Sequence, residues 1–327
     1  LFNTVQAYFD VRRAESFVSL RQNNVRLLTE QLRATRDRFE VGEVTRTDVS
    51  LAEARLSAAR SGLAAEQGGL ARAQEQFKAV VGRYPGRLAA PSRLPPIPGT
   101  EDAARGIARQ NNPQVLQVQH QVKAAELSVI QAARAVYPTL DATGRVSIDD
   151  DGDDSSSVGI QLSGPIYSGG SIASATRRAQ AQRDQARASL YTTGLLVDQQ
   201  VGNAYANLAV AIASIDASER QVRAAQLALD GVREELQLGA RTTLEVLSFE
   251  QDLLDAQAAR ISAQSAQYLA IYNLIAAMGL LTADDLHLGI ATYDPEAYFN
   301  AVKDAPVHDI SPQGAKLDAI IETLGRK

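Results

Sequence analysis

The first 82 residues of the chain recur, without a gap, near its end. Shifting the numbering by 197 aligns residues 1–82 with residues 198–279. The aligned residues include Ala7 with Ala204, Val25 with Val222, Arg36 with Arg233, Gly42 with Gly239, Thr45 with Thr242, Glu53 with Glu250 and Gly82 with Gly279. A repeat of this kind indicates that the chain builds one supersecondary unit twice. It favours a pseudosymmetric wall, such as a tube, over an enzyme built around one pocket.

Apolar residues recur at every seventh position in both copies. The first copy carries them at Val11, Val18, Val25, Leu32 and Phe39, and the second at Leu208, Ile215, Val222, Leu229 and Leu236. A further run follows at Val49, Leu56, Leu63, Leu70 and Phe77. A strict seven-residue period is the pattern of helices that supercoil around their neighbours. Each copy is therefore predicted to form a long antiparallel helical hairpin.

The 11 prolines mark where helices can run, because none precedes Pro85 and none lies between Pro165 and Pro295. Proline breaks helix interiors, so these two stretches can hold uninterrupted helices. We predict helices over residues 1–40, 46–81, 171–236 and 243–278, and the third would span roughly 100 Å. After a connector rich in proline and glycine at residues 83–99, Asn112 and Pro113 open a further helix that runs to about residue 135.

Two segments between the copies alternate apolar and polar residues. In Leu140–Ile148 and Val158–Ile166 the apolar residues stand at even positions and the polar ones at odd positions. This period predicts a strand pair with one apolar and one polar face. Each segment has the length of a tilted membrane strand. A soluble hairpin covered by a helix is the alternative, but the long flanking helices favour lipid as the cover.

The ends of this strand pair carry further signals. Tyr137 and Tyr167 flank its outer ends, where tyrosine suits a membrane–water interface. The acidic loop at residues 149–157 does not fit the EF-hand pattern and is expected to be a solvated turn.

The turns at the two hairpin tips predict helix caps. Gly42 and Gly239 suit the left-handed conformation that ends a helix. Thr45 and Thr242 then serve as N-caps of the returning helices, and Asp48 and Glu245, three residues later, can complete capping boxes. Capping gives these residues a structural role, and it leaves room for a second role if several tips meet on an axis.

Composition excludes several classes of function. A formal net charge of −5 and the lack of a basic block argue against nucleic-acid binding. The chain contains no run of 18 apolar residues, so the sequence predicts no transmembrane helix. The three histidines lack metal-ligand spacing, and no nucleophilic set or phosphate-binding loop is present. We therefore expect no enzyme, no cofactor and no metal site.

Several motifs carry a resemblance to a known family. The sequence LSGPIYSGG at residues 162–170 looks like a strand-to-helix junction, and Tyr137-Pro138-Thr139-Leu140 looks like an entry into a strand pair. Together with the two tips, which share the pattern Val/Leu-Gly-x-x-Thr, these motifs resemble the TolC family of outer-membrane efflux and export channels. The likeness runs from about residue 5 to residue 300.

The resemblance implies a fold, a location and partners. It implies a homotrimer that is mainly α-helical with a small β part, in which long antiparallel coiled-coil helices form an α-barrel joined to a transmembrane β-barrel. It implies a Gram-negative outer membrane, with lipid around the strands and a large periplasmic part. The expected function is the passive exit duct of a tripartite efflux or type I secretion system, which opens when a periplasmic adaptor and an inner-membrane transporter dock.

The resemblance also implies a gate at the helix tips. Arg241 matches an arginine that ties to a Thr-Asp pair, here Thr47 and Asp48, and Glu245 matches an acid that rings the pore. Ser248 stands where the family has a second ring acid, and Leu236 stands where it has a latching tyrosine. A second acid ring and an aromatic latch are therefore not expected in this chain.

These inferences divide the chain into five parts. Residues 1–82 form the first helical hairpin, 83–136 a connector with equatorial helices, 137–168 the transmembrane strand pair, 169–279 the second hairpin, and 280–327 an equatorial segment and tail. The repeat predicts that about 85 further residues would precede Leu1, since 112 − 197 = −85, so we expect a longer mature protein. The alternative is a soluble periplasmic coiled-coil scaffold or adaptor, which would have no use for the strand pair.

Overall fold

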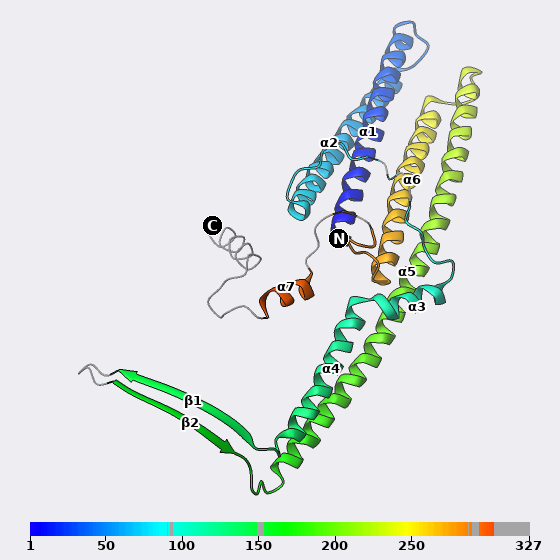
Figure 1. The fold of residues 1–327 in the computed structure, drawn as a ribbon. Helices are drawn as coiled ribbons and strands as arrows, with labels where there is room; N and C mark the ends of the chain where they lie inside the picture. Colours follow the sequence, from blue (N-terminus) through cyan, green and yellow to red (C-terminus); the bar gives the residue numbers. More distant parts are fainter. Residues whose placement is uncertain (90, 92–93, 149–153, 287, 290–293, 304–327) are drawn as a thin grey trace. The chain divides into compact units, whose positions relative to one another are not determined.

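The computed structural model describes residues 1–89, 91, 94–148, 154–286, 288–289 and 294–303 and divides the chain into two units. The first unit, Leu1–Leu281, contains α1 (Phe2–Glu40), α2 (Arg46–Val81), α3 (Glu101–Asn111), α4 (Pro113–Arg134), β1 (Thr139–Ile148), β2 (Asp154–Ser163), α5 (Ser171–Gln237) and α6 (Thr243–Ala277) (Figure 1). The second unit, Thr282–Lys327, contains α7 (Pro295–Val302).

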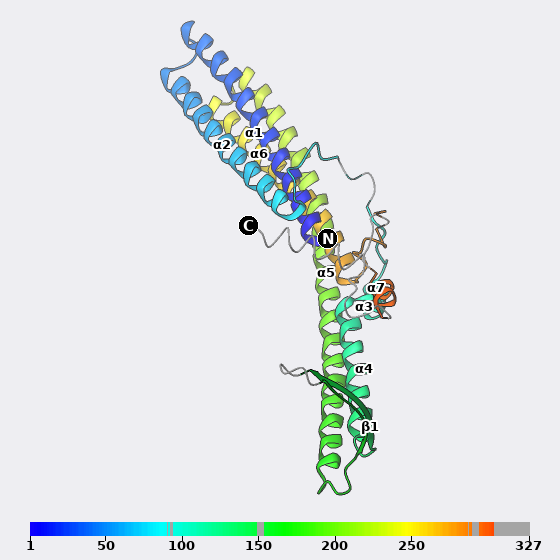
Figure 2. The same cartoon turned by 60° about the vertical axis from the view of Figure 1, so that its left-hand side comes forward.

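The predicted long helices form, with ends within one residue of those expected. Adding 197 to the bounds of α1 and α2 gives 199–237 and 243–278, which match the second half of α5 and the whole of α6. The repeat in sequence is therefore a repeat in structure. Within the first unit, α1 packs along α2, α6 packs along the second half of α5, and α1 also contacts α6 (Figures 1 and 2).

The heptad residues form the contacts between these helices. Val11, Leu32, Leu208 and Leu229 are buried, as the seven-residue period predicts. Phe39, the last residue of the first run, is 43% exposed, because α1 ends one residue later and leaves the run without a neighbour there. The seam thus holds each hairpin together along its length and ends at the tip.

A buried junction joins α3 and α4 to the base of the second hairpin. The Nδ2 atom of Asn112 donates to the Ala277 carbonyl at 2.9 Å, while its Oδ1 accepts from the amide of Gln114 at 2.9 Å and caps α4. Arg109 of α3 donates twice to Asp198 of α5, at 2.9 and 2.5 Å. The sequence predicted the Asn112 cap but gave no bounds for α3, whose 11 residues are too few for a heptad signal.

The strand pair is antiparallel, and its register places apolar residues of one strand opposite apolar residues of the other. Leu140 pairs with Leu162 and Ala142 with Ile160, so the apolar even positions of both strands share one face, as predicted. Among the described residues nothing covers this face: Val158, for example, is 90% exposed. Among the described helices, none is both long and apolar enough to cross a membrane.

The predicted bounds of the second strand were wrong at both ends. β2 begins at Asp154 rather than at Val158, because Ser155 and Ser157 pair with residues of β1 and extend the ladder. It ends at Ser163, because Gly164 lies so close to Pro138 that a Cβ atom there would be 3.0 Å from its ring, and Pro165 has no amide to donate. Of the predicted loop at 149–157, residues 154–157 are strand, and 149–153 lie outside the described residues.

Candidate functional site at the helix tips

The two hairpin tips end their first helices in the same way. Gly42 has a φ of 81° and Gly239 a φ of 76°, the left-handed region that glycine enters without strain. The next amide reaches back to close the motif in each tip, with Glu43 N to Arg38 O at 2.9 Å and Ala240 N to Glu235 O at 2.9 Å. This pattern is the Schellman motif, which satisfies the last carbonyls of a helix. It fixes the direction in which the chain leaves each helix.

The returning helices begin with the predicted capping boxes. The amide of Asp48 donates to Thr45 Oγ1 at 3.3 Å, and Asp48 Oδ2 accepts from the Thr45 amide at 2.9 Å. In the second tip, the Glu245 amide donates to Thr242 Oγ1 at 3.3 Å, and Glu245 Oε2 accepts from the Thr242 amide at 2.9 Å. The side-chain and backbone hydrogen bonds from Thr45 lower the pKa of Asp48 below its ordinary value. Both acids are therefore held as carboxylates at the start of their helices.

Arg241 distinguishes the second tip from the first, where its repeat position is Val44. Its Nε donates to Glu235 Oε2 at 2.7 Å and its Nη1 to Glu245 Oε1 at 2.8 Å. The Thr242 amide, the Arg241 guanidinium and the Thr242 hydroxyl together lower the pKa of Glu245 to about 2. Bonds to Glu235 and Glu245 raise the pKa of Arg241. The second tip thus carries a closed network of fixed charges.

The structure does not bring Arg241 to Asp48 within one protomer. Arg241 binds acids of its own tip, Asp48 bonds to Thr45, and Thr47 is exposed beside it. Arg241 keeps its Nη2 atom, and Asp48 its Oδ1 atom, free of hydrogen bonds within the described part of the chain. A link between these residues stays a prediction for contacts between protomers.

The capping of the second tip is expected to depend on acid pH. The pKa of Glu245 lies at about 2 in the folded chain, below its ordinary value of 4.5, so its contribution is present above pH 4.5 and is lost as the pH falls toward 2. We expect amide hydrogen exchange of residues 242–247, corrected for intrinsic rates, to stay slow from pH 7 to 5 and to accelerate below 4.5. Glu245→Gln should remove this dependence, and an unchanged profile in that variant would contradict the assignment.

Sequence reasoning missed a charged pair that occurs in both hairpins. Arg36 Nη2 lies 2.5 Å from Glu53 Oε1, and their repeat counterparts Arg233 Nη2 and Glu250 Oε1 are 2.8 Å apart. The side chain of Glu53 is 48% exposed, whereas that of Glu250 is 7% exposed, and its Oε2 atom has no partner among the described residues. Asn24 and Leu27 of α1 line a cavity of about 250 Å³ with Glu250. The signal was the same spacing of 17 residues in both copies.

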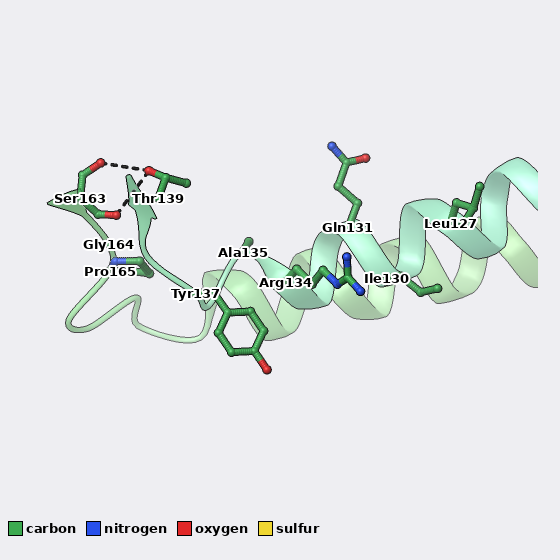
Figure 3. A pocket seen from close by; sticks show the side chains of 10 residues that line it. All are labelled: Leu127, Ile130, Gln131, Arg134, Ala135, Tyr137, Thr139, Ser163, Gly164 and Pro165. Carbon is green, nitrogen blue, oxygen red and sulfur yellow. Dashed lines mark hydrogen bonds between the residues drawn. The ribbon is translucent and has the colours of Figure 1, made fainter. Parts of the chain in front are cut away.

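A second candidate region lies where α4 meets the strands. Tyr137 and Tyr167 are both exposed at the outer ends of the pair. Tyr137 lines a cavity of about 710 Å³ between the last turns of α4 and the strand ends (Figure 3). Thr139 and Ser163 lie on its far side, with their hydroxyl oxygens 3.1 Å apart.

The chemistry available at these regions is charge and hydrogen bonding. Over the residues that the structure describes, no group of three or more His, Cys, Asp or Glu side chains is placed to hold a metal ion. The tips offer two capping carboxylates and one guanidinium, each fixed by its neighbours.

Comparisons with known proteins agree with this architecture. Residues 105–280 match the family model described as outer membrane efflux protein. The chain is 37% identical to outer membrane efflux protein BepC of Brucella suis over 93% of its length, and covers 68% of that protein. It is 29% identical to outer membrane protein TolC of Escherichia coli K12, covering 88% of this chain and 62% of TolC. A crystal structure of a membrane protein from Pseudomonas aeruginosa superposes with a TM-score of 0.71 at 20% identity, covering 85% of this chain and 67% of that one.

Proposed function

Because this chain belongs to the outer membrane efflux protein family, we propose that the full-length protein is the exit duct of a tripartite efflux or type I secretion system. The duct conducts passively and carries out no reaction. One observation carries this proposal: a strand pair with one uncovered apolar face lies on the same chain as a helix of 67 residues, which is about 100 Å long. A soluble scaffold would gain nothing from leaving such a face in water.

The duct is a homotrimer in this proposal. Within the described part of the chain, both edges of the two-stranded sheet are unpaired and its apolar face is uncovered. In a membrane, unpaired strand edges are satisfied only by further strands, so other strands of the full-length protein and of neighbouring copies must pair with them. Closed symmetry of three protomers brings three pairs of helix tips together on one axis. A periplasmic adaptor and an inner-membrane transporter dock at that end.

The tips form the gate of this duct. Three copies of Arg241, each with a free Nη2 atom, face the free Oδ1 of Asp48 and the exposed Thr47 of a neighbouring protomer. One exposed ion pair of this kind stabilises the closed gate by only about 0–1 kcal/mol, but the contributions of three pairs around the axis add together. Glu245 supplies a ring of three carboxylates, and in each chain Thr242 and Arg241 hold the pKa of Glu245 well below its ordinary value. Such a ring favours cations.

Arg241→Ser in the full-length protein is expected to raise the single-channel conductance in planar bilayers, because it removes the cation that joins the tips. Glu245→Ala should lower the preference for cations over anions, because it removes the ring of charge. The conductance and reversal potential of single channels in a salt gradient give both values. Thr100→Ala serves as a control, since it weakens a helix cap by about 1 kcal/mol away from the tips and without changing a charge. If Arg241→Ser and Glu245→Ala both behave like the parent, these residues act only as caps.

A further inference from the structure

Three arginines without acidic partners lie at the ends of α4 and α5 nearest the strands. Arg134 is the last residue of α4, and Arg177 and Arg178 lie in the second turn of α5. All three side chains are exposed, and none has an ion-pair partner within the described ranges. The chain as a whole has a formal net charge of −5, so the positive charge of these three arginines is opposite in sign to the net charge of the chain.

Two of the nearby acids are paired with other arginines, while a third, Asp141 of β1, accepts a hydrogen bond from Thr139 at 3.5 Å and has no ion-pair partner among the described residues. Glu126 Oε1 lies 2.7 Å from Arg187 Nη2, and the Arg187 bond lowers the pKa of Glu126. Asp184 Oδ1 lies 2.8 Å from Arg183 Nη2. The first turn of α5 contains no acid. Arg134, Arg177 and Arg178 therefore form no ion pair among the described residues and can bind a partner outside the protomer.

These arginines stand within a short distance of the strands. Tyr137 follows Arg134 by three residues, and β1 begins at Thr139. Arg177 is six residues into α5, which is about 9 Å along the helix. If the strands cross a membrane, the three guanidinium groups lie at the depth of the lipid head groups, beside Tyr137 and Tyr167.

A cavity beside Arg134 has the chemical character of a head-group site. Figure 3 shows Arg134 together with Leu127 and Ile130 on the α4 side, and Thr139 and Ser163 on the strand side. Its volume is about 710 Å³. It combines one guanidinium for a phosphate, two hydroxyls for a glycerol group and two aliphatic side chains for the first carbons of an acyl chain.

We propose that Arg134, Arg177 and Arg178 bind the phosphate groups of anionic phospholipids in the membrane leaflet that meets the helices. The proposal rests on the proposed function, which sets the strands in a membrane. Guanidinium groups bind phosphate through paired, charge-assisted hydrogen bonds, and each basic residue at an anionic surface strengthens binding about fivefold. The occupant is a lipid because the arginines adjoin the apolar strand face, Leu140 following Thr139 directly.

The test uses the full-length protein in a neutral detergent, titrated with phosphatidylglycerol or phosphatidylcholine. Native mass spectrometry counts the lipids that the assembled protein retains. We expect the parent to retain phosphatidylglycerol about tenfold more than phosphatidylcholine, and increasing salt to weaken this preference. The triple variant Arg134→Gln, Arg177→Gln, Arg178→Gln should lose the preference, and the corresponding triple lysine variant should keep most of it.

A matched control removes the same charge elsewhere. Arg33, Arg223 and Arg260 are exposed, have no ion-pair partner in the described chain and lie away from the strands. Their triple glutamine variant should bind phosphatidylglycerol like the parent. Equal loss in the control, or retained preference in the first variant, would overturn the proposal.

Further outcomes separate the possible partners. Displacement of the lipid by millimolar inorganic phosphate would mean that the arginines bind free phosphate. A change in the number of subunits in the Arg134, Arg177 and Arg178 triple glutamine variant would mean that they form a contact between copies of the chain. Either result would overturn the proposal. Conductance of the parent in phosphatidylcholine bilayers tests the proposed function separately. A parent that conducts but shows no lipid preference refutes the lipid site alone, and one that never inserts refutes both.

Discussion

Replacing Arg233 with methionine is expected to destabilise the protein by about 3 kcal/mol, because it leaves the buried Glu250 carboxylate without its cation. Glu250 is 7% exposed, and its second oxygen already lacks a partner among the described residues. Removing one member of a buried pair costs more than the pair contributes, since the remaining charge stays largely shielded from water. Chemical unfolding of the full-length protein, followed by helical circular dichroism, measures the loss.

The repeat supplies the control for this prediction. Arg36→Met removes the same side chain from the same position of the first hairpin, where Glu53 is 48% exposed. An exposed pair contributes about 0–1 kcal/mol, so this variant should unfold close to the parent. The loss of stability in Glu250→Gln should lie between those of Arg233→Met and Arg36→Met, since the Arg233 side chain is 39% exposed and can be hydrated. Equal effects of Arg233→Met and Arg36→Met would contradict the burial of the second pair.

Gly279→Ala is expected to destabilise the junction by about 3 kcal/mol, through backbone strain and a steric clash together. Gly279 has a φ of 80°, and a Cβ atom there would lie 2.5 Å from the Asn111 carbonyl oxygen and 2.7 Å from Asn112 Cα. Neither neighbour is a flexible side-chain end, so the α3–α4 junction must move. The Asn112 bond to the Ala277 carbonyl, 2.9 Å long, would be lost with it.

Gly82→Ala is the matched control, because Gly82 is the repeat counterpart of Gly279. Its φ is 87°, so it shares the strain of a left-handed alanine, but nothing described lies within 4 Å of the added atom. It should cost about 1 kcal/mol. Hydrogen exchange of residues 101–116 should accelerate in Gly279→Ala and stay unchanged in Gly82→Ala. Similar costs for both variants would mean that the close approach to Asn111 is not maintained.

The helices were predictable because their signals are local and repeated. Seven-residue spacing, proline-free stretches and Gly-x-x-Thr tips each depend on a few neighbouring residues. Both copies of the repeat carry these patterns, so each copy independently predicts the same helical hairpin. The bounds of β2 were not predictable from alternation, because the ladder partners of Ser155 and Ser157 and the contact of Gly164 with Pro138 are set by the opposite strand. The local pattern therefore predicted the faces of both strands and the bounds of β1 to within one residue, but it gave both ends of β2 incorrectly.

The candidate site shows the same division. The capping roles of Thr45, Thr242, Asp48 and Glu245 follow from spacing alone, and both boxes form. The ties of Arg241 to Glu235 and Glu245 depend on how the tip turns, which spacing does not fix. The burial of Glu250 depends on the contact of α1 with α6, two helices far apart in sequence. Sequence comparison of the copies aligned Glu53 with Glu250 but could not tell that one is exposed and the other buried.

The most direct test of the account asks whether the strand pair separates lipid from a water-filled passage. The chain has no cysteine, so single-cysteine variants of the full-length protein can be labelled from the aqueous phase without background. In outer-membrane vesicles, cysteine at Arg145 and Gln161 should react quickly with a charged thiol reagent, because the proposed duct turns this polar face toward the passage. Cysteine at Val146 and Ile160, on the apolar face, should react slowly. Rapid labelling at Val146 and Ile160, with slow labelling at Arg145 and Gln161, would contradict the account.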